Sequence, residues 1–313
     1  MAVSLFSPAK INLFLAVTGR REDGYHDLVS VAAPLDFGDE LELTEQDPGA
    51  ESRFTLECDD PTVPSGETNL VLKAAQVFAA ATGWPIRQAQ GRSGGVHFKL
   101  TKRIPVGAGL GGGSSNAVAA LRGLNQLSGG LLSGEKLAEA AAALGSDCAL
   151  FLAGAPVVMR GRGERIAPLP AGAADRLRGR RVLLLKPGFG ISTPWAYQRM
   201  VARGTDYLPA TAAEAALAAW SAGRTPAEEL LFNNMTGAAY EKFPALPVLL
   251  QKLRSEFGVA ALMSGSGSAC FALLGDPSTG SGQAHPADVV TRMEHFIRAC
   301  WGPPAFIQEA RLT

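Results

Sequence analysis

The sequence predicts an α+β protein that is divided into two domains. The chain has 313 residues, a length that suits two domains of ordinary size, each with its own core. Stretches typical of strands and of helices are mixed along the chain without strict alternation, which favours α+β layers. An arginine- and glycine-rich stretch at residues 160–165, followed by two prolines, indicates a boundary. We therefore expect one domain at residues 1–165 and a second at residues 166–313.

The first half of the chain predicts a sheet accompanied by helices. Strand-like composition or alternation marks several short stretches, at residues 3–6, 11–17, 28–35, 40–44, 54–58 and 96–102. Helical spacing of apolar residues, or an alanine-rich composition, marks residues 69–82, the stretch from residue 117 onward and residues 135–144. Ser114 or Ser115 is a natural N-cap for the second of these helices.

The second half of the chain predicts a smaller sheet with more helices. A buried strand is expected at residues 182–185, where Pro187 and Gly188 follow it. Strands at residues 258–263 and 269–274 enclose a glycine-serine run. Helices are expected at residues 194–202, 211–222, 233–242 and 246–257. Residues 276–286 have the composition of a surface loop.

The composition argues against nucleic acid and membrane partners. Apolar residues make up 47% of the chain, and 29 basic residues balance 29 acidic ones. A nucleic-acid-binding protein would carry a basic surplus, and a membrane span would need about 18 consecutive apolar residues, which the chain does not approach. No targeting segment is recognisable behind Met1, and the four cysteines show no C-x-x-C spacing. We expect a cytoplasmic protein with free thiols, and either a monomer or a homodimer.

A glycine-rich run that leads into a helix predicts a phosphate-binding loop. Residues 105–116 read P-V-G-A-G-L-G-G-G-S-S-N. Glycine allows a ligand to approach the backbone closely, and a helix N-terminus favours negative charge. The run matches G-x-G-x-x-G, but no acidic residue lies between Gly113 and Gly134 to hold a ribose, as the dinucleotide fingerprint requires. No lysine follows the run, which excludes the P-loop, so a third type of phosphate loop is expected.

Three other segments each allow two interpretations when taken alone. Lys10, in S-P-A-K-I-N-L, is either a fixed positive charge in a cleft or an ordinary solvated lysine. Asp147, in G-S-D, is either a general base or a helix N-cap. The run S-G-S-G-S at residues 264–268 is either a second ligand-binding loop or a plain hairpin turn.

Taken together, the four segments resemble the motifs of the GHMP kinases, in order and spacing over nearly the whole chain. The resemblance implies an N-terminal domain with a mixed sheet, the glycine loop and its helix. It also implies a ferredoxin-like C-terminal α/β sandwich, with an active site in the cleft between the domains. ATP with Mg²⁺ would be the phosphoryl donor, with no protein residue assigned as a metal ligand. The ATP-binding residues that the resemblance implies are Pro105, Gly107, Ala108, Gly109, Leu110, Gly111, Gly112, Gly113, Ser114, Ser115 and Asn116.

One further segment is similar to the cytidine-binding part of those family members that act on a CDP-alcohol. Residues 21–28 read R-E-D-G-Y-H-D-L. A tyrosine ring can stack on a planar base, and a histidine can hydrogen-bond the base edge, which suits Tyr25 and His26. A second segment, at residues 185–197, resembles the family's P-G-x-x-(I)-x-T segment. In the family this segment continues with three residues and a phenylalanine or tyrosine, which is Tyr197 here. There Thr193 would lie near the diphosphate and Tyr197 would face the cytosine, although Trp195 is a competing aromatic residue.

The resemblance implies phosphoryl transfer from ATP to a hydroxyl group of a small-molecule substrate, CDP-methylerythritol. Asp147 would accept the hydroxyl proton, and Lys10 would orient the hydroxyl and offset negative charge. The substrate side would be closed by Asn12 and by the second loop, through Gly265, Ser266 and Gly267. Two alternatives stay open: a family member that phosphorylates a small alcohol such as mevalonate or homoserine, and a non-catalytic nucleotide-binding relative. The family often has a small or apolar residue where this chain has Arg162.

Overall fold

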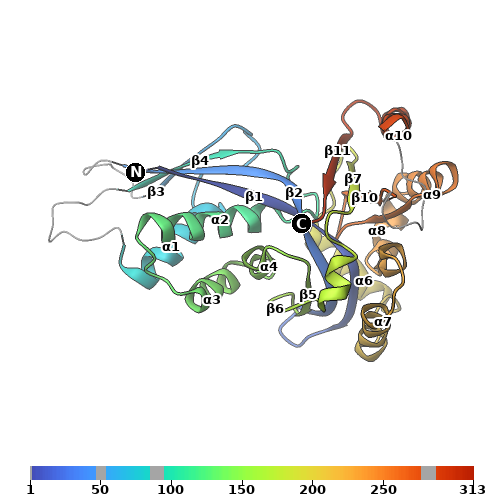
Figure 1. The fold of residues 1–313 in the computed structure, drawn as a ribbon, viewed down its shortest axis with the longest axis horizontal. Helices are drawn as coiled ribbons and strands as arrows, with labels where there is room; N and C mark the ends of the chain where they lie inside the picture. Colours follow the sequence, from blue (N-terminus) through green and yellow to red (C-terminus); the bar gives the residue numbers. More distant parts are fainter. Residues whose placement is uncertain (1, 47–53, 85–94, 276–286) are drawn as a thin grey trace. The chain divides into compact units, whose positions relative to one another are not determined.

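The computed structural model describes residues 2–46, 54–84, 95–275 and 287–313, which form two compact units (Figure 1). The first unit contains Met1–Ala9, Phe37–Val106 and Gly111–Leu152, and the second contains Lys10–Asp36, Gly107–Leu110 and Ala153–Thr313. The expected boundary after residue 165 falls inside strand β6 (Arg165–Pro168) and inside the second unit. Each unit is built from several separate stretches of the chain, so the two units cannot be compared with two domains that meet at a single residue.

Two long strands run through the sheet of the first unit. Strands β1 (Ala2–Arg20), β2 (His26–Glu45), β3 (Phe54–Cys58) and β4 (Val96–Thr101) lie in the order β3-β4-β2-β1. Strand β4 pairs antiparallel with β2 and parallel with β3, so the expectation of a mixed sheet is confirmed.

The sequence predicted two short strands where the structure has β1, and two more where it has β2. The apparent breaks arise because polar residues such as Ser7, Lys10 and Asp39 interrupt the apolar pattern. These side chains are buried and hydrogen-bonded inside the protein, so the strands continue through them.

Among the described residues, four helices complete the first unit: α1 (Leu70–Thr82), α2 (Gly112–Leu127), α3 (Gly134–Leu144) and α4 (Cys148–Ala153). Helices α1, α2 and α3 pack on one another. Asn69 caps α1, because its side chain accepts a hydrogen bond of 2.8 Å from the backbone N–H of Val71. Large apolar side chains such as Phe78, Phe98 and Leu121 are fully buried and form the core of this unit.

The second unit contains a four-stranded antiparallel sheet. Strands β7 (Arg181–Lys186), β9 (Ala260–Met263), β10 (Cys270–Leu273) and β11 (Phe306–Arg311) lie in the order β11-β7-β10-β9. Helices α6 (Thr193–Arg203), α7 (Ala210–Ala222), α8 (Thr236–Lys242) and α9 (Ala245–Phe257) connect β7 to β9, and α10 (Ala287–Trp301) connects β10 to β11. This strand–helix–strand–strand–helix–strand sequence is that of a ferredoxin-like fold, as expected.

Short strands pair with the long strands β1 and β2 within the second unit. Strand β8 (Phe232–Asn233) pairs parallel with β1, and β5 (Val157–Gly161) pairs antiparallel with β2 and with β6. The arginine- and glycine-rich stretch that suggested a domain boundary therefore forms the β5–β6 hairpin. Helix α5 (Ala171–Asp175) and a 3₁₀ turn (Ala227–Leu230) lie in the connections.

Two expectations drawn from composition can be compared with the structure. All four cysteines are free thiols, as predicted. In the parts of the chain described above, no helix is long and apolar enough to cross a membrane. The loop expected at residues 276–286 lies outside the described residues.

Candidate active site

Strand β1 carries a buried lysine and a buried asparagine that contact each other. Lys10 and Asn12 are 4% and 5% exposed, and the Lys10 ammonium donates a hydrogen bond of 2.6 Å to Oδ1 of Asn12. The amide of Asn12 donates in turn to Oγ of Ser30, at 2.9 Å. Lys10 is therefore not a solvated surface residue, because its head group is held in place inside the second unit.

The middle of the first glycine run lies against the second glycine-serine loop. The backbone N–H of Lys10 donates to the carbonyl of Leu110 at 2.9 Å, and the N–H of Ala269 donates to the carbonyl of Ala108 at 3.0 Å. The hydroxyl of Ser264 accepts from the N–H of Asn12 and donates to the carbonyl of Gly109. Backbone and side-chain bonds thus join β1 and both loops in one cluster.

Gly109 is the point of closest approach between the two loops. It has a φ of +80°, a conformation that side chains disfavour. A Cβ atom at this position would lie 2.6 Å from the carbonyl oxygen of Ser264, which is too close for any real contact. The spacing of glycines in the run is therefore set by this packing as well as by backbone conformation.

The second loop connects β9 to β10 and is also a hairpin turn, but it is buried. Ser264, Ser266 and Ser268 are all at most 7% exposed. The hydroxyl groups of Ser266 and Thr193 lie 2.8 Å apart, and Ser268 donates to the carbonyl of Phe189. These contacts bring Thr193, which the sequence assigned to the substrate side, next to the second loop.

Asn233 also positions the second loop, and the sequence analysis did not identify it. Its amide nitrogen donates two hydrogen bonds of 2.8 Å, to the carbonyls of Met263 and Gly265. The residue is 5% exposed and is the last residue of the short strand β8. No sequence motif marks it, because its role depends on the pairing of β8 with β1.

An aromatic group surrounds His26. The imidazole stacks on the ring of Tyr197, with 4.6 Å between the ring centroids, and its Nε2 lies 3.1 Å from the hydroxyl of Tyr207. Tyr25 is 54% exposed, and the Arg162 guanidinium lies 4.6 Å from the centroid of its ring. The competing aromatic residue, Trp195, packs instead against Phe243, in a separate group.

The surroundings of His26 favour its neutral form. Burial lowers the pKa of this imidazole below its ordinary value, and the positive charge of Arg20 lowers it further. A neutral imidazole has one nitrogen that donates and one that accepts. Tyr207 was not predicted from the sequence; the only available signal was the scarcity of tyrosine, of which the chain has four.

The first unit holds the start of helix α2. Gly111, with a φ of +74°, is the N-cap residue, and no side chain supplies a capping hydrogen bond. The prediction that Ser114 or Ser115 caps the helix is therefore wrong, because the helix begins at Gly112 and both serines lie in its first turn. Backbone N–H groups at an N-terminus without a side-chain cap can bind an anion.

Asp147 lies in the same unit, directly before helix α4. The thiol of the next residue, Cys148, has a pKa raised to about 11, mainly because it is buried. A hydrogen bond with Ser114 acts in the opposite direction and lowers this pKa, whereas the charge of Asp147 raises it. This segment therefore lies beside the first turn of α2. Lys10 belongs to the second unit, so its pairing with Asp147 stays a prediction.

The predicted site residues thus fall into three groups. The first group is the cluster around the two loops, with Lys10, Asn12, Thr193, residues 107–110 and the second loop. The second group is the aromatic one, with Tyr25, His26 and Tyr197. Pro105, residues 111–116 and Asp147 belong to the first unit. Within the described ranges, no group of three or more histidine, cysteine, aspartate or glutamate residues could hold a metal ion.

Comparison with known protein families agrees with this geometry. Residues 69–155 match the model of the GHMP kinases N terminal domain, and residues 212–287 match that of the GHMP kinases C terminal domain. The fold and the two loops therefore define a kinase of this class.

Individual relatives specify the class further. The chain is 40% identical, over 88% of both chains, to a 4-diphosphocytidyl-2-C-methyl-D-erythritol kinase of Synechococcus sp. (strain CC9902). It is 34% identical to a solved 4-(cytidine 5'-diphospho)-2C-methyl-D-erythritol kinase, with a TM-score of 0.73 over 99% of this chain and 100% of the other. A mevalonate kinase from Methanococcus jannaschii shares the fold, with a TM-score of 0.69 over 100% and 98% of the two chains, but only 12% identity. The chain belongs to the GHMP kinases, and among them to the 4-diphosphocytidyl-2-C-methyl-D-erythritol kinase family.

Proposed function

We propose that this chain transfers the γ-phosphoryl group of ATP to the 2-hydroxyl group of 4-diphosphocytidyl-2-C-methyl-D-erythritol, in the non-mevalonate route to isoprenoid precursors. The observation that carries the proposal is the aromatic group at His26, which stacks on Tyr197 and contacts Tyr207. A kinase for a small alcohol without a nucleotide has no use for such a group beside an exposed tyrosine. A cytosine base has a planar face for Tyr25 and a polar edge for His26.

The first glycine run supports the proposed use of ATP. Helix α2 begins without a side-chain cap, so the N–H groups of its first turn suit phosphate oxygens. Bound Mg²⁺ would neutralise charge on the transferring phosphates. Because the described residues contain no ready-made metal cluster, we expect the ion to be held mainly by phosphate oxygens and water, which suits the coordination of Mg²⁺.

The proposed chemistry uses one acid–base group and one fixed positive charge. Asp147 accepts the proton of the attacking hydroxyl group, and Lys10 orients that hydroxyl and offsets the developing negative charge. The hydrogen bond from Lys10 to Asn12 holds the ammonium in one orientation. The hydroxyl groups of Thr193 and Ser266, which lie 2.8 Å apart, would bond the diphosphate on the substrate side.

An assay of ATP consumption with four alcohols tests the proposed function. The acceptors are the CDP-methylerythritol compound, mevalonate, homoserine and galactose, each at the same concentration. We expect turnover with the first alone, and competitive inhibition of that turnover by CDP. Turnover with mevalonate or homoserine that is indifferent to CDP would assign the chain to the small-alcohol kinases instead.

The variant Asp147→Asn tests the proposed general base. Asparagine caps helices as well as aspartate does, so the start of α4 is preserved, but the amide cannot accept the proton. We expect kcat to fall by about 10²- to 10⁴-fold, while CDP still binds and the melting temperature is unchanged. Near-normal turnover in steady-state assays would reduce Asp147 to a structural residue.

A further inference from the structure

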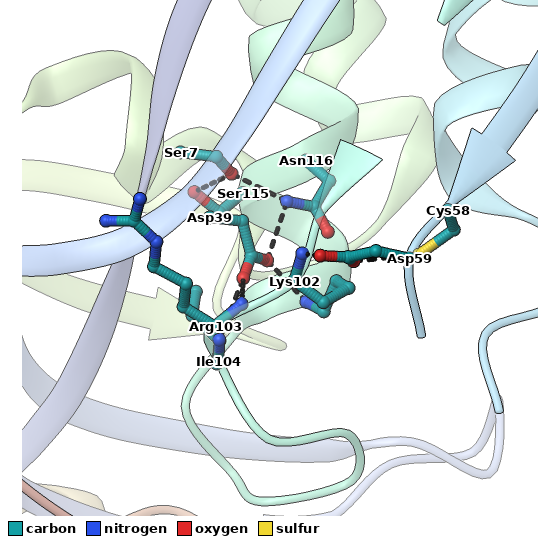
Figure 2. A network of polar contacts seen from close by, with 9 residues as sticks. All are labelled: Ser7, Asp39, Cys58, Asp59, Lys102, Arg103, Ile104, Ser115 and Asn116. Atoms are coloured by element: carbon teal, nitrogen blue, oxygen red, sulfur yellow. Dashed lines mark hydrogen bonds and ion pairs between the residues drawn. The ribbon is translucent and has the colours of Figure 1, made fainter. Parts of the chain in front are cut away.

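A carboxylate that the proposed mechanism does not use lies at the centre of a polar network in the first unit (Figure 2). Asp39, on strand β2, is 0% exposed. Its Oδ1 accepts hydrogen bonds from the backbone N–H groups of Arg103 at 2.7 Å and Ile104 at 2.8 Å. Its Oδ2 accepts from the Lys102 ammonium and, at 2.9 Å, from the amide nitrogen of Asn116.

The four donors come from the two sides of the first glycine run. Lys102, Arg103 and Ile104 directly precede the run, whereas Asn116 is its last residue and the fifth residue of α2. Ser7, on strand β1, adds a second connection, because its hydroxyl donates to Ser115 at 2.9 Å and accepts from Asn116 at 2.8 Å. Figure 2 shows that the residues of this network come from three further segments of the chain, around Ser7, residues 102–104 and residues 115–116.

The hydrogen bonds of Asp39 use the full capacity of its carboxylate. A carboxylate offers about four acceptor sites, and four donors bind this one. A group in this state can neither take a proton from a substrate nor coordinate an ion. Any effect of Asp39 on the reaction must therefore act through the segments that it holds.

Charge gives the network a second consequence. The Lys102 side chain is 7% exposed, and its ammonium group lies 3.2 Å from the position that a Cβ atom of Gly112 would take. It is therefore next to the first residue of α2, where the positive end of the helix dipole also lies. Without Asp39 this buried positive charge would lose the carboxylate that it is paired with at that end of the helix, which would disturb the first turn.

We propose that Asp39 is a positioning residue for ATP, because it fixes both ends of the phosphate-binding glycine run and neutralises Lys102 beside helix α2. This inference rests on the proposed role of the run in ATP binding. Asp39 does not touch ATP; it sets the backbone that does.

The variant Asp39→Asn tests this role, with calorimetric binding of two probes as the readout. The probes are a non-hydrolysable ATP analogue and CDP, so the result does not depend on which alcohol is phosphorylated. The Asn oxygen can still accept from Arg103 and Ile104, but its amide group would face two other donors, Lys102 and Asn116. We expect the Kd of the ATP analogue to rise at least tenfold, and the Kd of CDP to stay within twofold.

Glu228→Gln is the matched control. It removes the charge of another acid that is paired with a buried cation, Arg180, but in the second unit, whereas the Asp39 network lies in the first. We expect this variant to lower the melting temperature without changing either Kd. Ser7→Ala is a milder second variant that deletes the connection to Ser115 and Asn116, and it should raise the Kd of the ATP analogue severalfold.

Two outcomes would overturn the proposal. In the first, Asp39→Asn and Ser7→Ala lower the melting temperature but leave the Kd of the ATP analogue unchanged, as a purely structural network would. In the second, the Kd values of both probes rise in parallel. Failure of the proposed function would look different, because the ATP analogue would still bind while no CDP-alcohol was phosphorylated.

Discussion

At the scale of single residues, His26 links the fold to the proposed substrate. Its imidazole is 7% exposed, stacks on Tyr197 and contacts the hydroxyl of Tyr207. The three residues come from strand β2, helix α6 and the segment before α7. Only the folded chain brings them together, and the stack leaves the imidazole little freedom to rotate. The residue can therefore present one fixed edge to a base.

The pH dependence of substrate affinity should reveal this histidine. Burial and Arg20 lower the pKa of His26 below its ordinary value of 6.5, so the imidazole stays neutral at pH values somewhat below 6.5. In the unfolded chain the imidazole takes up its proton near 6.5, so folding stability also declines as the pH falls through 6.5 toward the lowered pKa. We expect the KM for the CDP-alcohol to rise only below pH 6.5. A His26→Gln variant should not show this rise in steady-state kinetics; a rise that persists there would contradict the assignment.

Tyr207 should act on the substrate through His26. Removing its hydroxyl in Tyr207→Phe deletes the 3.1 Å contact with Nε2 while the ring remains. One neutral hydrogen bond contributes about 1 kcal/mol, so we expect the KM for the CDP-alcohol to rise about fivefold at unchanged kcat. Tyr240→Phe, in helix α8 of the same unit, is the matched control and should leave KM unchanged. Equal KM values for both variants would show that Tyr207 does not act on the substrate.

At the scale of elements, the contact between the two glycine loops shapes the second unit. Gly107 and Gly109 both have positive φ, at +63° and +80°, but only at Gly109 would a Cβ atom collide with the second loop. Alanine at either position costs about 1–2 kcal/mol of folding free energy, because its side chain disfavours the left-handed backbone. The two variants therefore separate conformational strain from steric collision.

We expect Gly109→Ala to unfold at a lower temperature than Gly107→Ala, by at least several degrees in a thermal scan. A difference of 1 kcal/mol corresponds to about 1.5 °C in a chain of this length, and the collision at 2.6 Å should cost more than that. Equal melting temperatures would show that the loops do not depend on this contact.

Prediction from sequence was strongest for elements that local patterns define. The bounds of β3 were predicted as observed, and Asn69 lies at the predicted start of α1. Helix α10 was missed, although its buried Val290, Met293 and Ile297 follow helical spacing. The start of α2 was placed too late because glycine is a poor helix former, yet here glycines occupy the first two positions of the helix.

The candidate site was predictable where residues lie in motifs and not where they act through tertiary contacts. The motifs and their spacing identified Lys10, Asn12 and the two loops, and hydrogen bonds join these parts in the structure. Asp39 and Asn233 have no local signature, because the donors that bind Asp39 and the two carbonyls that Asn233 donates to are more than 25 positions away along the chain. Such residues become visible only when buried polar groups are followed to their partners.

At the scale of the whole molecule, the two units interleave because β1 and β2 each pass from one unit to the other. The first unit contains helix α2 and Asp147, and the second contains Lys10, the second loop and the aromatic group at His26. Each unit therefore carries part of the proposed machinery. A kinase of this family needs both parts, so we expect the complete transfer to the alcohol only from the intact chain.

Phosphorus NMR of the reaction of the intact chain with ATP and the CDP-methylerythritol compound tests that claim most directly. We expect one new phosphomonoester signal that appears together with ADP, while the two phosphorus signals of the CDP group persist as a diphosphate. Formation of inorganic phosphate without a new monoester, or extension of the diphosphate itself, would contradict phosphoryl transfer to the alcohol.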